Sequence, residues 1–260
     1  MKGGIAGLAN ETAEIDVLMY HSISTEPGPT SIAPGTFKMQ MDALATRGYQ
    51  TISLEDFAAW RRGEKTLPGK SIVITFDDGF LDFAECAHPI MRAHGFTATV
   101  FLPSDCIGGV ESWAGANARP RALMRWEQIR ALANDGIDFG GHSLTHADLT
   151  RVTPQEMRRQ VGACKDAIEQ HTGRRVTSFA PPYGRSTPEL RAEIARYYEI
   201  SVGTRLGRAT RSCDPFDVPR IEMFYFCDAA RWHDHLDNRG GAYLRVRQFL
   251  RGARAALRSA

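Results

Sequence analysis

The 260-residue sequence has little excess charge, no CxxC cysteine pair and no hydrophobic run long enough to cross a membrane. Its formal net charge is only +2, which excludes the extended basic field typical of nucleic-acid binding, so we expect no nucleic-acid partner. Hydrophobic residues make up 43% and charged residues 24% of the chain, which excludes a disordered protein. Length and composition together predict one folded domain over residues 1–260.

The N-terminus and the cysteines bear on cellular location. Residues 1–10 carry one positive charge and a short, weakly apolar run that Glu11 and Glu14 interrupt, which does not match a secretory signal peptide. The cysteines form no even disulfide set, as is typical of reduced thiols in a cytosol. They are Cys86, Cys106, Cys164, Cys213 and Cys227. We therefore expect a cytoplasmic protein whose residues 1–14 form a flexible N-terminal segment.

Two adjacent carboxylates, Asp77 and Asp78, follow the apolar run 71–76 and precede Gly79. The run predicts a buried strand of a parallel sheet, and such strands present functional side chains at their carboxyl ends. Repulsion and burial would raise the pKa of one carboxyl sharply. A bound cation would instead offset the charge of one acid and leave the other as an ionised base.

A pair of histidines supplies the remaining candidate ligands. His142 and His146 follow the strand-like segment 137–139 and lie four residues apart, so one helical turn would point both the same way. One carboxylate and two imidazoles, with coordination positions left open, form the pattern of a catalytic divalent-metal site. Each pattern alone has an ordinary explanation. Two adjacent acids can lie on a solvated turn, and two histidines four residues apart can occur by chance. Together they favour the metal site.

Three segments of the sequence resemble the first three motifs of the polysaccharide deacetylases, the NodB-homology or carbohydrate esterase family 4 enzymes. The segments are Thr75–Gly79, His142–His146 and Ala180–Gly184, and the resemblance extends over about Val17 to Ile221. The first two motifs are highly specific. The third departs from the family pattern, because Ala180 stands where many members carry arginine.

The resemblance implies a role for each motif residue. Asp78, His142 and His146 would hold a divalent metal ion, most commonly zinc, and Asp77 would be the general base that acts on a water molecule. The backbone N–H of Tyr183 would donate a hydrogen bond to the tetrahedral oxyanion. A rigid turn with a packed aromatic ring is the alternative for the Tyr183 segment.

A general acid is also needed, because the leaving amine must be protonated. The C-terminal third contains no clear Leu-x-His motif, and His233 and His235 are expected at the surface. His21 instead follows the short apolar segment Val17–Tyr20, which resembles the circularly permuted poly-N-acetylglucosamine deacetylase branch. We predict that His21 is the acid; a structural histidine at a strand end is the alternative.

Arg220 is the candidate to replace the arginine absent at position 180. It lies in Val218–Ile221, near a late strand, from which a guanidinium would hold the Asp77 carboxylate ionised and in place. A surface arginine after a proline is the alternative.

Strand-like and helical stretches alternate along the chain, which favours right-handed βα crossovers. The resemblance and this alternation predict a distorted (β/α)7-type barrel, the NodB-homology fold, in one domain. Thr153–Glu156 forms a capping box that starts one helix. The strand-like stretches are Val17–Tyr20, Gln50–Ile52, Ile72–Phe76, Thr97–Leu102, Ile137–Phe139, Thr177–Ala180, Ile200–Val202 and Arg220–Met223.

Two further segments have candidate roles outside the motifs. The connection Ser104–Arg125 carries Trp113, which is expected either to stack on a sugar ring or to pack against the barrel. In the C-terminal helix, arginines lie opposite an apolar stripe that includes Val246 and Leu250. That stripe is expected to close the barrel, and peripheral contact with an anionic membrane is the alternative.

These inferences predict a metal-dependent hydrolase that removes an N-acetyl group from an amino sugar in surface-polysaccharide or glycoconjugate biosynthesis. The expected substrate is an N-acetylated saccharide or its lipid-linked form. Hydrolysis of a non-carbohydrate amide, formamide or imide is one alternative, and a non-catalytic sugar-binding barrel is another.

Overall fold

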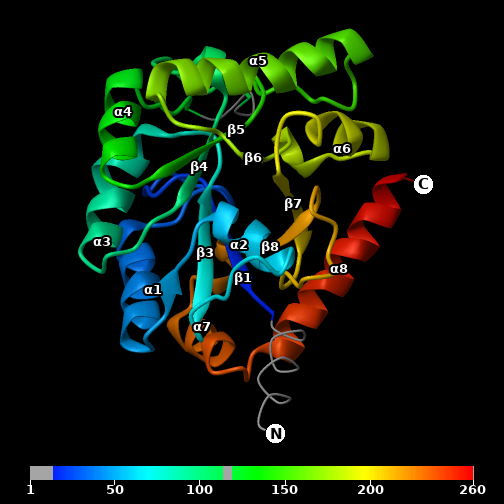
Figure 1. Cartoon of the computed structure of the whole chain (residues 1–260). Coiled ribbons are helices and arrows are strands. Elements are labelled where there is room, and N and C mark those ends of the chain that lie inside the picture. Colours follow the sequence, from blue (N-terminus) through cyan, green and yellow to red (C-terminus); the bar gives the residue numbers. More distant parts are fainter. Residues whose placement is uncertain (1–13, 114–118, 260) are drawn as a thin grey trace, which may run out of the picture.

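The computed structural model describes residues 14–113 and 119–259, with side chains described up to residue 252. Seven parallel strands form a closed barrel, with β1 paired to β3 to complete the ring, as predicted (Figure 1). An eighth strand, β2 (Gln50–Thr51), pairs with the start of β3. Around the ring the order is β1 (Asp16–Tyr20), β8 (Val218–Glu222), β7 (Ile200–Leu206), β6 (Ser178–Phe179), β5 (Asp138–Gly141), β4 (Thr99–Leu102) and β3 (Ser71–Phe76).

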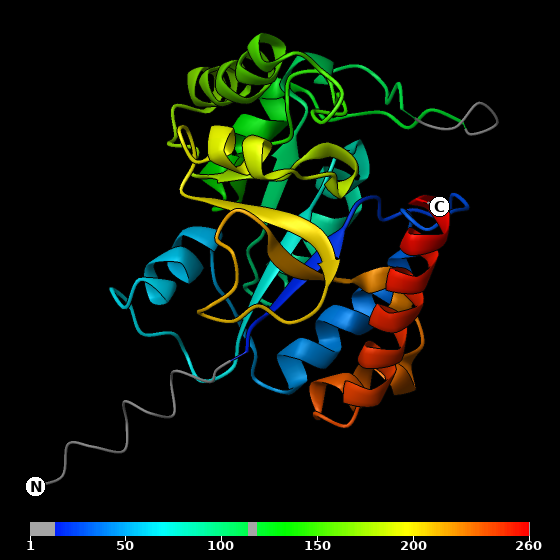
Figure 2. The ribbon, with the colours of Figure 1, turned by 90° about the vertical axis from the view of Figure 1, so that its right-hand side faces the viewer.

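Helices surround this barrel on the outside (Figures 1 and 2). In α5 the Thr153 hydroxyl accepts a hydrogen bond from the Glu156 N–H, and Gly173 ends the helix with φ +65°, so the predicted start is confirmed. The helices are α1 (Pro34–Thr46), α2 (Leu54–Arg61), α3 (His88–Arg92), α4 (Trp126–Asn134), α5 (Pro154–Thr172), α6 (Pro188–Ile194), α7 (Ala229–Leu236) and α8 (Gly241–Ser259).

An aromatic cluster fixes the ends of β1 and β3. Tyr20 and Phe76 are register partners, and their fully buried rings stack with centroids 5.1 Å apart. Phe83 packs edge-on against Phe76 at 4.8 Å. Burying each such ring stabilises the fold by roughly 1.5–3 kcal/mol. His21 and Asp77 directly follow these two rings in the chain. The packing therefore fixes the backbone positions from which the His21 and Asp77 side chains extend.

The structure corrects two sequence-based expectations about the C-terminal region. His235 is not at the surface: it is 2% exposed and contacts the Asp16 carboxylate at 2.8 Å, because α7 packs the face carrying Trp232 and His235 inward. The apolar stripe of α8 does not close the barrel, since Val246 is 56% and Leu250 43% exposed.

Within the described residues, no helix combines the length and apolar character needed to cross a bilayer. The expectation for residues 1–14 falls, apart from Glu14, outside the described part of the chain.

Candidate metal centre and active site

The site begins where β3 ends in a sharp turn. Asp78 and Gly79 have φ of +74° and +69°, a conformation that favours glycine and strains other residues. A Cβ on Gly79 would lie 2.7 Å from Leu102 Cδ2, so a side chain there also meets a packed neighbour. The turn places Asp77 and Asp78 in the interior, each only 4% exposed.

His142 and His146 converge on Asp78. Their Nε2 atoms lie 3.3 Å and 3.1 Å from Asp78 Oδ1, and the ligand atoms of the three residues lie within 4.8 Å of one another. The helical turn expected between the histidines is not formed, because Ser143 and His146 have φ of +63° and +57°. The left-handed turn after β5 aims both rings instead.

The donor set fits a divalent cation. His142 Nδ1 lies 2.6 Å from the Ala180 carbonyl oxygen, to which it donates, so Nε2 is the ring nitrogen that faces Asp78. Asp78 Oδ1 is buried and has no hydrogen-bond partner among the described residues. Burial raises the pKa of Asp78, but its contacts with His142 and His146 outweigh burial and bring the pKa well below the ordinary value. An ionised buried carboxylate facing two ring nitrogens is a set that zinc accepts.

Arg220 reaches Asp77 from β8. Its NH1 and NH2 atoms lie 2.7 Å from Oδ1 and 2.7 Å from Oδ2 of the carboxylate, and its Nε donates to the Gly203 carbonyl at 2.8 Å. Burial raises the pKa of Asp77, but the Arg220 guanidinium outweighs burial and lowers it. Asp77 is therefore an ionised carboxylate held by two charge-assisted hydrogen bonds.

His21 and Tyr183 border the same space. His21 Nε2 lies 3.8 Å from Asp77 Oδ2, and the His21 side chain is 17% exposed. Tyr183 has φ +62°, and its ring packs edge-on against His146 with centroids 4.7 Å apart. The seven residues that the sequence predicted as metal ligands or as catalytic or positioning groups thus all lie in or beside one site.

A cavity of about 790 Å³ opens over these groups. It is also lined by Trp113, which was expected from the sequence either to stack on a sugar ring or to pack against the barrel, and by Glu222, to which the sequence assigned no role. Trp113 stacks on the His146 ring with centroids 4.0 Å apart, so its packing partner is a candidate metal ligand. Burial raises the pKa of Glu222. The strand period of two, which puts Glu222 on the same face as Arg220, is the signal that could have identified it.

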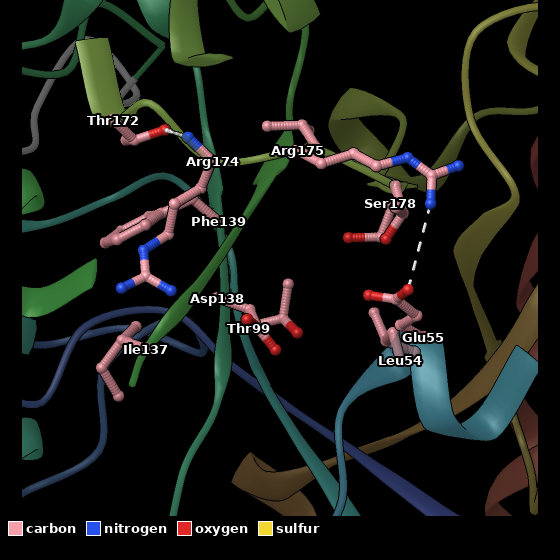
Figure 3. A pocket seen from close by; sticks show the side chains of 12 residues that line it. Leu54, Glu55, Thr99, Ile137, Asp138, Phe139, Thr172, Arg174, Arg175 and Ser178 are labelled. Atoms are coloured by element: carbon pink, nitrogen blue, oxygen red, sulfur yellow. Dashed lines mark hydrogen bonds and ion pairs between the residues drawn. The ribbon is translucent and has the colours of Figure 1, made fainter. Parts of the chain in front are cut away.

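A second cavity lies at the opposite end of the barrel, where Thr99, Asp138 and Ser178 begin their strands (Figure 3). Glu55 and Arg175 approach each other across it at 4.0 Å. Its volume is about 40 Å³, little more than the roughly 30 Å³ share of one water molecule. It is too small for a saccharide, and its lining includes none of Asp78, His142 and His146. The cavity over those three residues is therefore the candidate active site.

Comparison with known proteins gives consistent matches. A family model described as polysaccharide deacetylase matches residues 64–201. The putative polysaccharide deacetylase YxkH of Bacillus subtilis (strain 168) is 27% identical over 212 residues, which cover 81% of this chain and 72% of that protein. The poly-beta-1,6-N-acetyl-D-glucosamine N-deacetylase of Escherichia coli (strain K12) is 28% identical over 141 residues, 48% of this chain but only 20% of that protein.

Solved structures share the fold. IcaB from Ammonifex degensii matches with a TM-score of 0.71 and 22% identity, covering 86% of this chain and 98% of that one. The Streptococcus pyogenes deacetylase PplD matches with a TM-score of 0.71 and 23% identity, covering 80% of this chain and 92% of that one. Because the family model alone spans more than half of the 260 residues, this chain is an enzyme of the polysaccharide deacetylase family.

Proposed function

We propose that the protein is a metal-dependent N-deacetylase of an amino sugar. The observation that carries the proposal is one cavity that joins a buried Asp-His-His set to a separate carboxylate, Asp77, kept ionised by Arg220. Relatives named as deacetylases of poly-N-acetylglucosamine and of peptidoglycan support an N-acetylated saccharide as the substrate.

Asp78, His142 and His146 would hold the metal ion, for which zinc is our candidate because of the one-carboxylate, two-imidazole set. When bound, the ion supplies Lewis acidity for an acetamide carbonyl and lowers the pKa of a water molecule.

The chain's own residues supply the proton transfers. Asp77, ionised and fixed by Arg220, accepts a proton from the water that attacks the acetamide carbonyl carbon. His21, which directly follows the neighbouring strand β1 and lies 3.8 Å from Asp77 Oδ2, donates a proton to the leaving amine. The backbone N–H of Tyr183 donates to the developing oxyanion. Arg220 acts through Asp77 and is a positioning residue.

Acetate release is the test. The zinc-loaded protein is incubated with short N-acetylglucosamine oligomers, with polymeric chitin, and with a cyclic imide and a formamide, with Asp77→Asn as the inactive control. We expect acetate from the oligomers and a loss of about 10²–10⁴-fold in Asp77→Asn. Turnover of the imide or formamide alone would reject the carbohydrate substrate. Saccharide binding without any hydrolysis would reject catalysis.

A further inference from the structure

Helix α8 leaves an apolar face to solvent. Phe249 is 76% exposed, Val246 56% and Leu250 43%, and their i, i+3, i+4 spacing puts the three side chains on one side of the helix. Figures 1 and 2 both show α8 on the outside of the barrel. Three large apolar side chains grouped in this way are more than the scattered exposed residues of an ordinary surface.

The opposite face of α8 already attaches the helix to the barrel. Leu244 is buried, and Gln248 Nε2 donates to the Leu206 carbonyl of β7 at 2.9 Å. Arg247 lies over the Tyr225 ring, 4.9 Å from its centroid. The exposed apolar face is therefore not used to hold the described part of the fold together.

The charge of α8 indicates what kind of surface would cover that face. The helix contains no aspartate or glutamate, and its charged residues are Arg245, Arg247, Arg251, Arg254 and Arg258. In the part of the chain with described side chains, Arg245 is exposed and makes no ion pair. A helix with an apolar face and only basic charges complements an anionic lipid surface. A second copy of the chain would instead bring two all-basic helices together, which repulsion opposes.

The same helix borders the active-site cavity. Arg251 lines the cavity that contains Asp77 and His21. One helix thus contributes both the exposed apolar face and part of the cavity wall, so whatever α8 binds lies close to the cavity.

We propose that α8 is a peripheral membrane-binding helix, in which Val246, Phe249 and Leu250 enter the interface of a bilayer with anionic headgroups. Docking in this way brings the cavity to the membrane surface. The substrate class that follows, a membrane-attached N-acetylated saccharide, rests on the proposed function, whereas the docking itself does not.

Vesicle sedimentation tests the docking. The full-length protein is mixed with vesicles of phosphatidylcholine alone or of phosphatidylcholine with phosphatidylglycerol. We expect binding to the anionic vesicles only, weakened by salt. The double variant Val246→Asp, Phe249→Asp should bind at least about tenfold more weakly. Val110→Asp is the matched control, because Val110 has the same exposed fraction, 56%, as Val246; it should bind as the unmodified protein does. Circular dichroism checks that each variant is folded.

Three outcomes would overturn the proposal: no binding to anionic vesicles, equal loss in Val110→Asp, or a dimer in solution that the double variant dissociates. Acetate release from a soluble oligomer, measured on the same preparations, should not change in the double variant. Vesicle binding without hydrolysis would reject the proposed function alone, and hydrolysis without vesicle binding would reject the docking alone.

Discussion

Arg220 offers the sharpest test of how the proposed base, Asp77, is kept ionised. Replacing it with Met removes the partner of a carboxylate that is only 4% exposed and leaves Asp77 charged in the interior. Removing one member of a buried ion pair typically costs about 3–5 kcal/mol. The Asp77 pair has two 2.7 Å hydrogen bonds and an arginine that is 1% exposed, so we expect a loss in this range at pH 7. That is a large part of the roughly 5–15 kcal/mol by which domains are stable.

The loss should depend on pH. In the unmodified protein the pKa of Asp77 lies below its unfolded value, so this contribution to stability is present above the unfolded pKa of about 3.9 and is lost as pH falls through the folded pKa. In Arg220→Met, burial instead raises the pKa of Asp77, and protonation at acid pH relieves the penalty. The difference in unfolding free energy between the two proteins should therefore be largest at neutral pH and shrink toward about pH 4.

Urea unfolding of the metal-free proteins, followed by circular dichroism, measures this difference. Arg220→Met, Asp77→Asn should be more stable at pH 7 than Arg220→Met alone, because no uncompensated charge remains. Arg220→Lys should recover only part of the stability, since an ammonium cannot repeat the two-point contact. A loss below about 1 kcal/mol, or one that does not vary with pH, would refute the reasoning.

Three other changes have defined outcomes. His21→Ala should lower acetate release by about 10²–10⁴-fold, whereas His233→Ala should leave it nearly unchanged; the reverse order of losses would reject His21 as the acid. Since burial raises the pKa of Glu222 above its unfolded value, its contribution to stability is present below the unfolded pKa and lost as pH rises. Glu222→Gln should therefore raise the urea midpoint at pH 8 and not at pH 4, and equal midpoints at pH 8 would contradict this. Gly79→Ala should destabilise by about 1–3 kcal/mol in thermal unfolding, because φ is +69° and a Cβ would meet Leu102; an unchanged transition would show that the turn relaxes.

Strand positions could be predicted from the sequence where a continuous apolar run marks the strand. The apolar run before Asp77 predicted 72–76, and the structure forms Ser71–Phe76. The strand expected at 137–139 extends instead over Asp138–Gly141. Its two glycines weaken a strand signal, yet the fold requires them: a Cβ on Gly140 would lie 2.5 Å from the Phe101 ring and one on Gly141 2.8 Å from the Phe179 ring.

In the candidate site, too, local sequence patterns predicted some features, whereas others depend on contacts between distant segments. Motif spacing pointed to Asp78, His142 and His146, since each follows a strand-like segment and the carboxyl ends of parallel strands meet at one end of the sheet. The stack of Trp113 on His146 joins a loop to a turn, and no local pattern encodes it. For α8, periodicity identified an apolar stripe but not which face the barrel would bury, because that depends on contacts such as Gln248 with Leu206.

Metal content tests the central claim most directly. The protein, purified without chelator and equilibrated with zinc, is compared by elemental analysis with Asp78→Ala, His146→Ala and the control His233→Ala. The proposed site predicts one zinc ion per chain in the unmodified protein and the control, and loss of the ion in both ligand variants. Equal zinc content in all four proteins would contradict the assignment of Asp78, His142 and His146 as the metal site.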